Sequence, residues 1–134
     1  MLKRISLTLM ALVVIVAGGL FATQKFLTPM SSDLSVVGQG TPTLVLAYEN
    51  YSPDSGAALN QLNSLRHDYA DQLRFVVADL GTPDGQAFAR RHRLANGLAL
   101  LLDGDGKPLK VARLSSDEAS LRTQLEDKLA LLNL

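Results

Sequence analysis

An uncharged stretch of 19 residues near the start of the chain, Ile5 to Thr23, most limits what this sequence can fold into. As a helix it would rise about 28 Å, close to the hydrocarbon thickness of a bilayer. A helix that is apolar on every face has no core large enough to bury it in a chain of 134 residues. Lys3 and Arg4 precede the stretch, so the positive-inside rule keeps the N-terminus in the cytoplasm. We therefore predict a transmembrane signal-anchor over residues 1–24.

A cleaved signal peptide is the alternative to this anchor. The apolar region is longer than the roughly 7–15 residues that are usual in signal peptides. Its exit has no clean Ala-x-Ala, and the nearest candidates are Ala17 to Gly19 and Leu20 to Ala22. These features favour the uncleaved form, which is a single-pass protein of a bacterial-type inner membrane with its C-terminal domain in the periplasm. The cleaved form would be a freely soluble periplasmic protein.

Charge and cysteine content exclude several functions for the remainder of the chain. Lys3, Arg4 and Lys25 account for three of the 13 basic residues, whereas all 13 acidic residues follow them, so residues 26–134 carry a net charge of about −3. Phosphate contacts need Lys and Arg, so this acidic part predicts no nucleic-acid binding. The sequence has no cysteine, which excludes disulfides and thiol chemistry. We predict no metal site and no cofactor.

Residues 25–41 contain Pro29, Gly38 and Gly40 and have weak periodicity, so we predict a linker there. Ser35 to Val37 is a candidate for a short edge strand within it. From residue 42 onward, short apolar runs alternate with amphipathic segments. The predicted strands and helices, in chain order, are Thr43–Tyr48, Ser52–Asp71, Leu73–Asp79, Thr82–His92, Leu98–Leu102, Pro108–Leu114 and a last helix that begins at Ser115 to Glu118 and carries Leu121, Leu125, Leu129 and Leu132 on one stripe.

This order, β-α-β-α-β-β-α, predicts an α/β domain over residues 42–134. A β-α-β unit makes a parallel strand pair with a right-handed crossover. The Asp103 to Gly106 turn joins the last two strands as an antiparallel hairpin, since glycine adopts positive φ at little cost. The result is a mixed four-stranded sheet with helices on both faces. For the last helix, Ser115 at the N-cap and Glu118 three residues later predict a capping box.

The segment Ser52-Pro53-Asp54-Ser55 is a strong signal for the start of a helix. The Ser52 hydroxyl can accept a hydrogen bond from a free backbone N–H at the N-cap. Proline suits the first helical position, and the charge of Asp54 complements the helix dipole. Thr82 to Asp84 repeats the pattern at the next helix. The pattern therefore needs no catalytic explanation.

The stretch "TLVLAYENYSPDSGAALNQL" resembles the strand and redox corner of thioredoxins and their membrane-anchored periplasmic relatives. In that family an aromatic residue precedes a Cys-x-x-Cys at the N-terminus of a helix. Here Tyr51 matches the aromatic residue, and Ser52 and Ser55 fall where the two cysteines would lie. The resemblance covers roughly residues 41–132. It implies a thioredoxin-like fold with a degenerate redox motif at Ser52, Pro53, Asp54 and Ser55.

Further departures from the family remove the rest of its chemistry. The resemblance places the family's buried acid near Leu46, which cannot relay a proton. It places the family's cis-proline within Gly97 to Ala99, yet no proline occurs between Pro83 and Pro108. We therefore predict a redox-inactive domain, not an enzyme, that binds a protein partner as an accessory subunit or assembly factor of a membrane complex. Membership in the periplasmic thiol-disulfide exchange system is the disfavoured alternative.

Two further motifs are candidate sites. A serine hydrolase would need a base near Ser52, but His67 lies 15 residues further along the predicted helix, and helical geometry separates them by about 22 Å. Asp103 to Gly106 begins like a calcium loop, but Lys107 follows it, so a hairpin turn is favoured.

Two groups of residues are candidates for contact with a partner. The basic cluster Arg90, Arg91 and Arg93 closes a helix; a solvated helix end is its simpler interpretation, and docking of an acidic partner or of anionic headgroups is the functional one. Tyr51 is the second candidate, if it is exposed beside the helix start. We expect Tyr48 to lie in the core at the end of its strand.

Overall fold

The computed structural model describes residues 30–50 and 53–133. The predicted anchor, residues 1–24, lies outside these ranges. Among the residues that are described, no helix has the length and apolar character needed to cross a membrane.

The elements follow the predicted order and form one mixed sheet. The strands are β1 (Thr43–Tyr48), β2 (Arg74–Asp79), β3 (Leu98–Leu102) and β4 (Pro108–Arg113), and the α-helices are α2 (Pro53–Leu65), α3 (Pro83–His92) and α4 (Glu118–Leu132). The strand order is β2-β1-β3-β4; β1 pairs with β2 in parallel, whereas the β1–β3 and β3–β4 pairs are antiparallel. The predicted mixed four-stranded sheet is confirmed.

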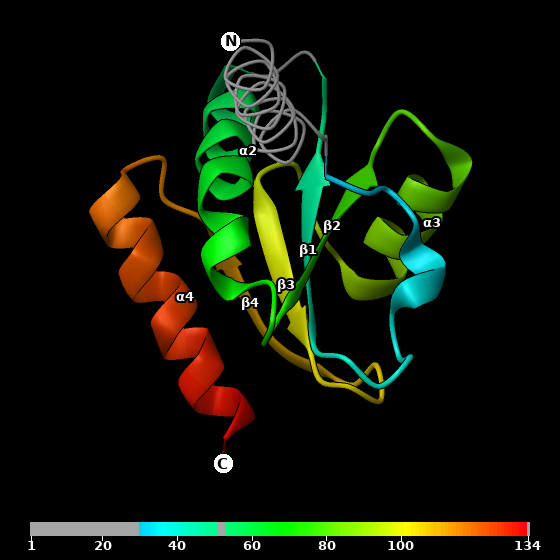
Figure 1. Cartoon of the computed structure of the whole chain (residues 1–134). Helices are drawn as coiled ribbons and strands as arrows, with labels where there is room; N and C mark the ends of the chain where they lie inside the picture. Colours follow the sequence, from blue (N-terminus) through cyan, green and yellow to red (C-terminus); the bar gives the residue numbers. More distant parts are fainter. Residues whose placement is uncertain (1–29, 51–52, 134) are drawn as a thin grey trace, which may run out of the picture.

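Successive side chains of β1 point to opposite faces of the sheet, and each face has its own hydrophobic core. Leu44 and Leu46 point to the face that α2 and α4 cover, while Val45 and Ala47 point to the face that α3 covers (Figure 1). All four side chains are fully buried. The predicted stripe of the last helix is confirmed, since its four leucines pack in the first core: Leu121, Leu125, Leu129 and Leu132. Side chains of α2 and of the segment after it pack in the same core: Leu59, Leu62, Leu65 and Tyr69.

The predicted edge strand at Ser35 to Val37 is wrong. Residues Leu34–Val36 form a 3₁₀ helix, η1, because the Asp33 carboxylate accepts hydrogen bonds from the Ser35 backbone N–H, at 3.0 Å, and from the Ser35 hydroxyl. An extended contact does exist earlier, where Ser31 forms a parallel bridge with Val76 of β2.

The second half of the predicted linker packs on the domain. Leu34, Val36 and Val37 contact the core under α3, and the Gly40 backbone N–H donates to the Gly104 carbonyl at 2.9 Å. The sequence does not predict this packing, because three apolar side chains in a short irregular segment form no periodic pattern.

The last helix starts on Asp117, so the predicted capping box at Ser115 and Glu118 is wrong. The Asp117 carboxylate accepts from the Ser120 backbone N–H at 3.0 Å, and Glu118 is the first helical residue. The Ser115 hydroxyl instead accepts from the Asp117 N–H at 3.1 Å. Aspartate and serine are equally good N-cap residues. The helix therefore starts after whichever of them reaches a free backbone N–H of the first turn.

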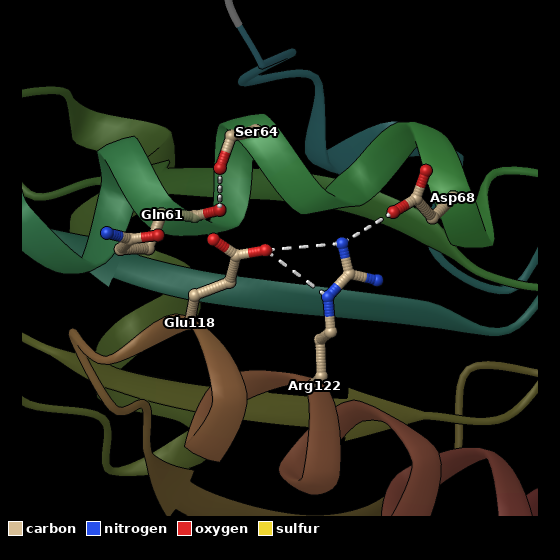
Figure 2. Close-up of polar contacts among 5 residues, drawn as sticks. All are labelled: Gln61, Ser64, Asp68, Glu118 and Arg122. Carbon is tan, nitrogen blue, oxygen red and sulfur yellow. Dashed lines mark hydrogen bonds and ion pairs between the residues drawn. The ribbon is translucent and has the colours of Figure 1, made fainter.

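The first helix ends earlier than the predicted Asp71. The α-helix closes at Leu65 and continues as a 3₁₀ turn, η2, over Arg66–Tyr69. Arg122 of α4 joins this segment to α4, since its Nη2 lies 3.0 Å from the Asp68 carboxylate and 3.4 Å from that of Glu118 (Figure 2). These groups are exposed, so the ion pairs orient the helices more than they stabilise the domain.

Candidate functional site

The site that the sequence singles out is the place where β1 leads toward α2, which we call the corner. The Tyr48 carbonyl accepts from the Leu80 backbone N–H at 2.9 Å, which joins the carboxyl ends of the parallel strands β1 and β2. The Tyr48 hydroxyl donates to Asn50 Oδ1 at 3.0 Å. Tyr48 is half-buried rather than enclosed in the core as expected, because its hydroxyl reaches this polar partner. The end of β1 is thereby fixed before the chain turns toward α2.

A loop before β3 lies against this corner. The Glu49 backbone N–H donates to Asn96 Oδ1 at 2.9 Å, and the Gly97 N–H donates to the Ala47 carbonyl at 2.9 Å. Gly97 has φ of 86°, a conformation that glycine adopts without strain. The resemblance places the family's cis-proline turn in this loop, and every peptide bond within residues 30–50 and 53–133 is trans. The Asn96 side chain, rather than a proline, links this loop to the corner.

The degenerate motif lies partly within the described structure. Tyr51 and Ser52 fall outside the described residues, so their places stay predictions. Pro53 is the first residue of α2, and Asp54 and Ser55 follow in its first turn, as a helix start requires. The Thr82-Pro83 start of α3 shows the same pattern in full: Thr82 Oγ1 accepts from the Gly85 N–H at 3.1 Å.

The corner is hollowed on the side of β2 and carries acidic groups there. Glu49, Asn50, Asp79, Leu80 and Gly81 line a depression of about 290 Å³. One Asp79 carboxylate oxygen accepts from the Gly81 N–H at 2.8 Å. Carboxylates and an amide can accept and donate hydrogen bonds to a peptide or protein, but among the described residues the depression brings no histidine or lysine to a nucleophile.

The basic cluster lies at the end of α3, away from the corner. Arg90, Arg91 and Arg93 are all exposed, and Arg93 adopts a left-handed conformation with φ of 55°, which ends the helix. Arg91 lines a cleft of about 600 Å³ between α3, η1 and the hairpin turn, together with the carboxylates of Asp33 and Asp84. Arg90 and Arg93 do not line this cleft, and the role of the three arginines as a partner contact stays a prediction.

The two histidines lie in elements other than α2. His67 lies in η2, after α2 has ended, and His92 closes α3. Within the described residues, no cluster of three or more His, Asp or Glu side chains could hold a metal ion. The Asp103 carboxylate accepts from the N–H groups of Asp105 and Lys107, both at 2.9 Å, so it closes the hairpin turn as expected.

His92 gives the domain a predicted acid sensitivity. Burial against Phe88, whose ring centroid lies 4.5 Å away, lowers the pKa of His92, and the charge of Arg91 lowers it further. A lowered pKa in the folded state means that protons bind the unfolded chain more strongly. The free energy of unfolding should therefore fall as the pH drops below about 6.5, the usual histidine pKa.

We expect His92→Gln to flatten this part of the pH profile between pH 7 and pH 5. Since the imidazole is only partly buried, the change should be small, about 0.5 kcal/mol or less. Urea unfolding at a series of pH values measures it, with His67→Gln as the matched control. A profile that keeps its full slope in His92→Gln would contradict this origin.

Sequence reasoning missed Asn96 as part of the corner. The dipeptide Asn96-Gly97 is a turn signal in its own right, and it indicates a tight turn before β3. It does not indicate that the amide reaches the Glu49 N–H, which is 47 residues away in the chain. That contact depends on the sheet order, which places β3 beside β1.

No protein-family model and no curated protein matches the sequence. Solved structures do match the fold. Trxlp from Edwardsiella tarda has a TM-score of 0.59 at 20% identity, over 72% of this chain and 96% of its own. Mitochondrial thioredoxin 3 from Saccharomyces cerevisiae has a TM-score of 0.59 at 15% identity, over 77% of this chain and 98% of its own.

A third match, to a thioredoxin-like protein from Clostridium perfringens, has a TM-score of 0.62 at 16% identity, over 76% of this chain and 81% of its own. Identities this low establish the fold and nothing finer. Together with the strand order and the corner between β1 and α2, they identify this chain as a protein of the thioredoxin-like fold, with no cysteine in its sequence.

Proposed function

We propose that this chain is a redox-inactive, membrane-anchored member of the thioredoxin-like fold that acts by binding a protein partner. The observation that carries the proposal is the absence of cysteine from a chain with this fold. Thiol-disulfide exchange needs a thiolate nucleophile, and a serine hydroxyl cannot form a disulfide. Binding is the activity that a thioredoxin scaffold retains when its sulfur atoms are gone.

The surroundings of the corner support this choice over another enzyme activity. Leu46, where the resemblance expects a buried acid, is fully enclosed among apolar side chains. The Asn96 amide is committed to the Glu49 backbone. Neither a leucine side chain nor an amide can relay a proton, so neither residue supplies the acid that the resemblance expects at this corner.

We further propose that residues 1–24 anchor the domain in a bacterial-type inner membrane, with the domain in the periplasm. The uncharged run Ile5 to Thr23 and the preceding Lys3 and Arg4 support this arrangement. The partner would then be a protein of the same membrane, and the chain an accessory subunit or assembly factor of its complex. Ala17 to Gly19 offers small residues for close helix packing.

Extraction of the tagged full chain from membranes in mild detergent, followed by affinity purification, tests the proposal. We expect one polypeptide to co-purify at a fixed ratio, and to do so equally with Ser52→Ala/Ser55→Ala, because the hydroxyls start a helix rather than perform chemistry. A lone chain under all extraction conditions would count against a complex. The mass of the mature N-terminus separates the anchored form from a cleaved, soluble one.

A further inference from the structure

The strand β4 forms an open edge of the sheet. It pairs with β3 on one side, and no described strand pairs with its other side. About half of the backbone N–H and C=O groups of such a strand point away from the sheet, where another strand can pair with them. Pro108 opens the strand and shortens the pairing edge, and the register shifts at Leu101 and Leu102 of β3. The part of β4 that can pair with another strand is therefore Leu109 to Arg113.

This edge carries exposed apolar side chains. Leu109 is 39% exposed and Val111 is 45% exposed. Within the described structure, Leu131 of α4 is the only other large apolar residue of comparable exposure. Val111 lies opposite Leu100, whose side chain points into the core under α3, so Val111 extends that core to the edge of the sheet. Two neighbouring apolar side chains on an open strand indicate a contact surface.

The same edge is basic, although the domain is acidic. Lys107, Lys110 and Arg113 are exposed, and residues 107–113 contain no acidic side chain. On the α4 side, the pKa of Lys128 is lowered by burial and by the charge of Lys110, and Asp127 offsets this only in part. A carboxylate beside Lys110 would relieve this repulsion. Charge and shape thus favour the same occupant.

We propose that β4 is a docking edge for an extended segment of a partner protein in which acidic residues alternate with branched apolar ones. The segment adds a strand to the sheet, and its backbone pairs with Leu109 to Arg113. Its apolar residues contact Val111 on the α3 side of the sheet, and its carboxylates face Lys110 on the α4 side. Arg113 adds a positive charge at the end of the edge. This inference rests on the proposed function and assigns the surface and the chemistry of the partner.

Two other occupants fit less well. A second copy of this chain, paired β4 to β4, would bring two basic edges together, and like charges across a strand pair are destabilising. An anionic lipid surface would satisfy the cations but would leave the row of backbone groups unpaired. An acidic strand satisfies the cations, the apolar side chains and the backbone together.

Amide chemical shifts of the labelled full chain in detergent micelles test the docking edge. The probe is a capped nine-residue peptide of alternating valine and glutamate, and its counterpart alternates valine and lysine. We expect the first peptide alone to shift the amides of residues 107–113. Lys110→Glu/Arg113→Glu should weaken its binding at least about tenfold, whereas the matched charge change Arg90→Glu/Arg91→Glu on α3 should change it less than about twofold.

Four results would overturn the docking edge. They are equal binding of both peptides, shifts confined to other residues, no binding at millimolar peptide, and a concentration-dependent dimer that Val111→Lys disrupts. Stronger binding of anionic vesicles than of the acidic peptide by residues 107–113 would replace the protein partner with a lipid surface.

Co-purification separates this inference from the proposed function. If a membrane partner stays bound to Lys110→Glu/Arg113→Glu, the docking edge is wrong and the binding function stands. If no partner co-purifies with the unchanged chain, the binding function itself fails, whatever the peptides do.

Discussion

Gly85→Ala is expected to destabilise the domain by about 3 kcal/mol or more, because the helix α3 touches the end of β2 at this residue. A Cβ atom at Gly85 would lie 1.9 Å from the Asp79 carbonyl oxygen and 2.5 Å from its carbon. Both are backbone atoms of a paired strand and cannot move aside. Thr82 also holds the start of α3 against the end of β2, since its hydroxyl donates to the Asp79 carbonyl at 2.8 Å.

Gly56→Ala is the matched control, since it adds the same methyl group to α2. Apart from the two chain neighbours and the backbone of its own helix, nothing lies within 4 Å of a Cβ built at Gly56. Alanine reduces the freedom of the unfolded chain at a helical position, so we expect a gain of roughly 0.4–1 kcal/mol. Urea unfolding of the two variants measures both effects. A Gly85→Ala variant as stable as the parent chain would contradict the close approach of α3 to β2.

Leu46→Asp is expected to cost even more, and the loss should depend on pH. Leu46 is fully buried between Val77 of β2 and Ala99 of β3. Truncation in Leu46→Ala should cost about 2–5 kcal/mol. The aspartate adds the penalty of burying a charge among apolar groups, so at neutral pH we expect the variant to be largely unfolded.

Acid should partly rescue Leu46→Asp relative to Leu46→Ala. Burial raises the pKa of a carboxyl group, so the folded variant binds a proton more readily than the unfolded one. Stability that is missing at neutral pH should therefore return as the pH falls, within the range in which the parent chain stays folded. Circular dichroism of both variants from pH 7 to pH 4 measures this. An aspartate variant as stable as Leu46→Ala at pH 7 would show that the site is open to water or holds a polar partner.

Much of the fold follows from local patterns in the sequence. Thr43–Tyr48 and Leu98–Leu102 have the predicted bounds because continuous apolar runs end at turn residues. Features that depend on long-range packing do not follow. The start of α4 at Asp117 depends on which of several capping side chains reaches Ser120. The packing of residues 34–37 depends on a core that exists only after β1, β3 and α3 have come together.

The candidate site likewise has features that follow from local sequence and features that depend on long-range packing. The start of α2 at Pro53 is a local property and is readable from the sequence. The reach of Asn96 to Glu49 depends on the strand order. The docking edge was missed because Pro108 to Arg113 is indistinguishable, as a sequence, from a strand with partners on both sides. Its openness depends on its place at the end of the sheet.

The account rests on the corner being a thioredoxin redox corner in which hydroxyl groups occupy the positions of the two thiols. Ser52→Cys/Ser55→Cys tests this directly. A disulfide needs Cα atoms about 4.4–6.8 Å apart, a separation that the first turn of a helix supplies. After mild oxidation, thiol alkylation and mass spectrometry of the full chain should show an internal disulfide, whereas Ser64→Cys/Ser120→Cys keeps two free thiols. Free thiols, or only disulfide-linked dimers, in the Ser52→Cys/Ser55→Cys chain would contradict the account.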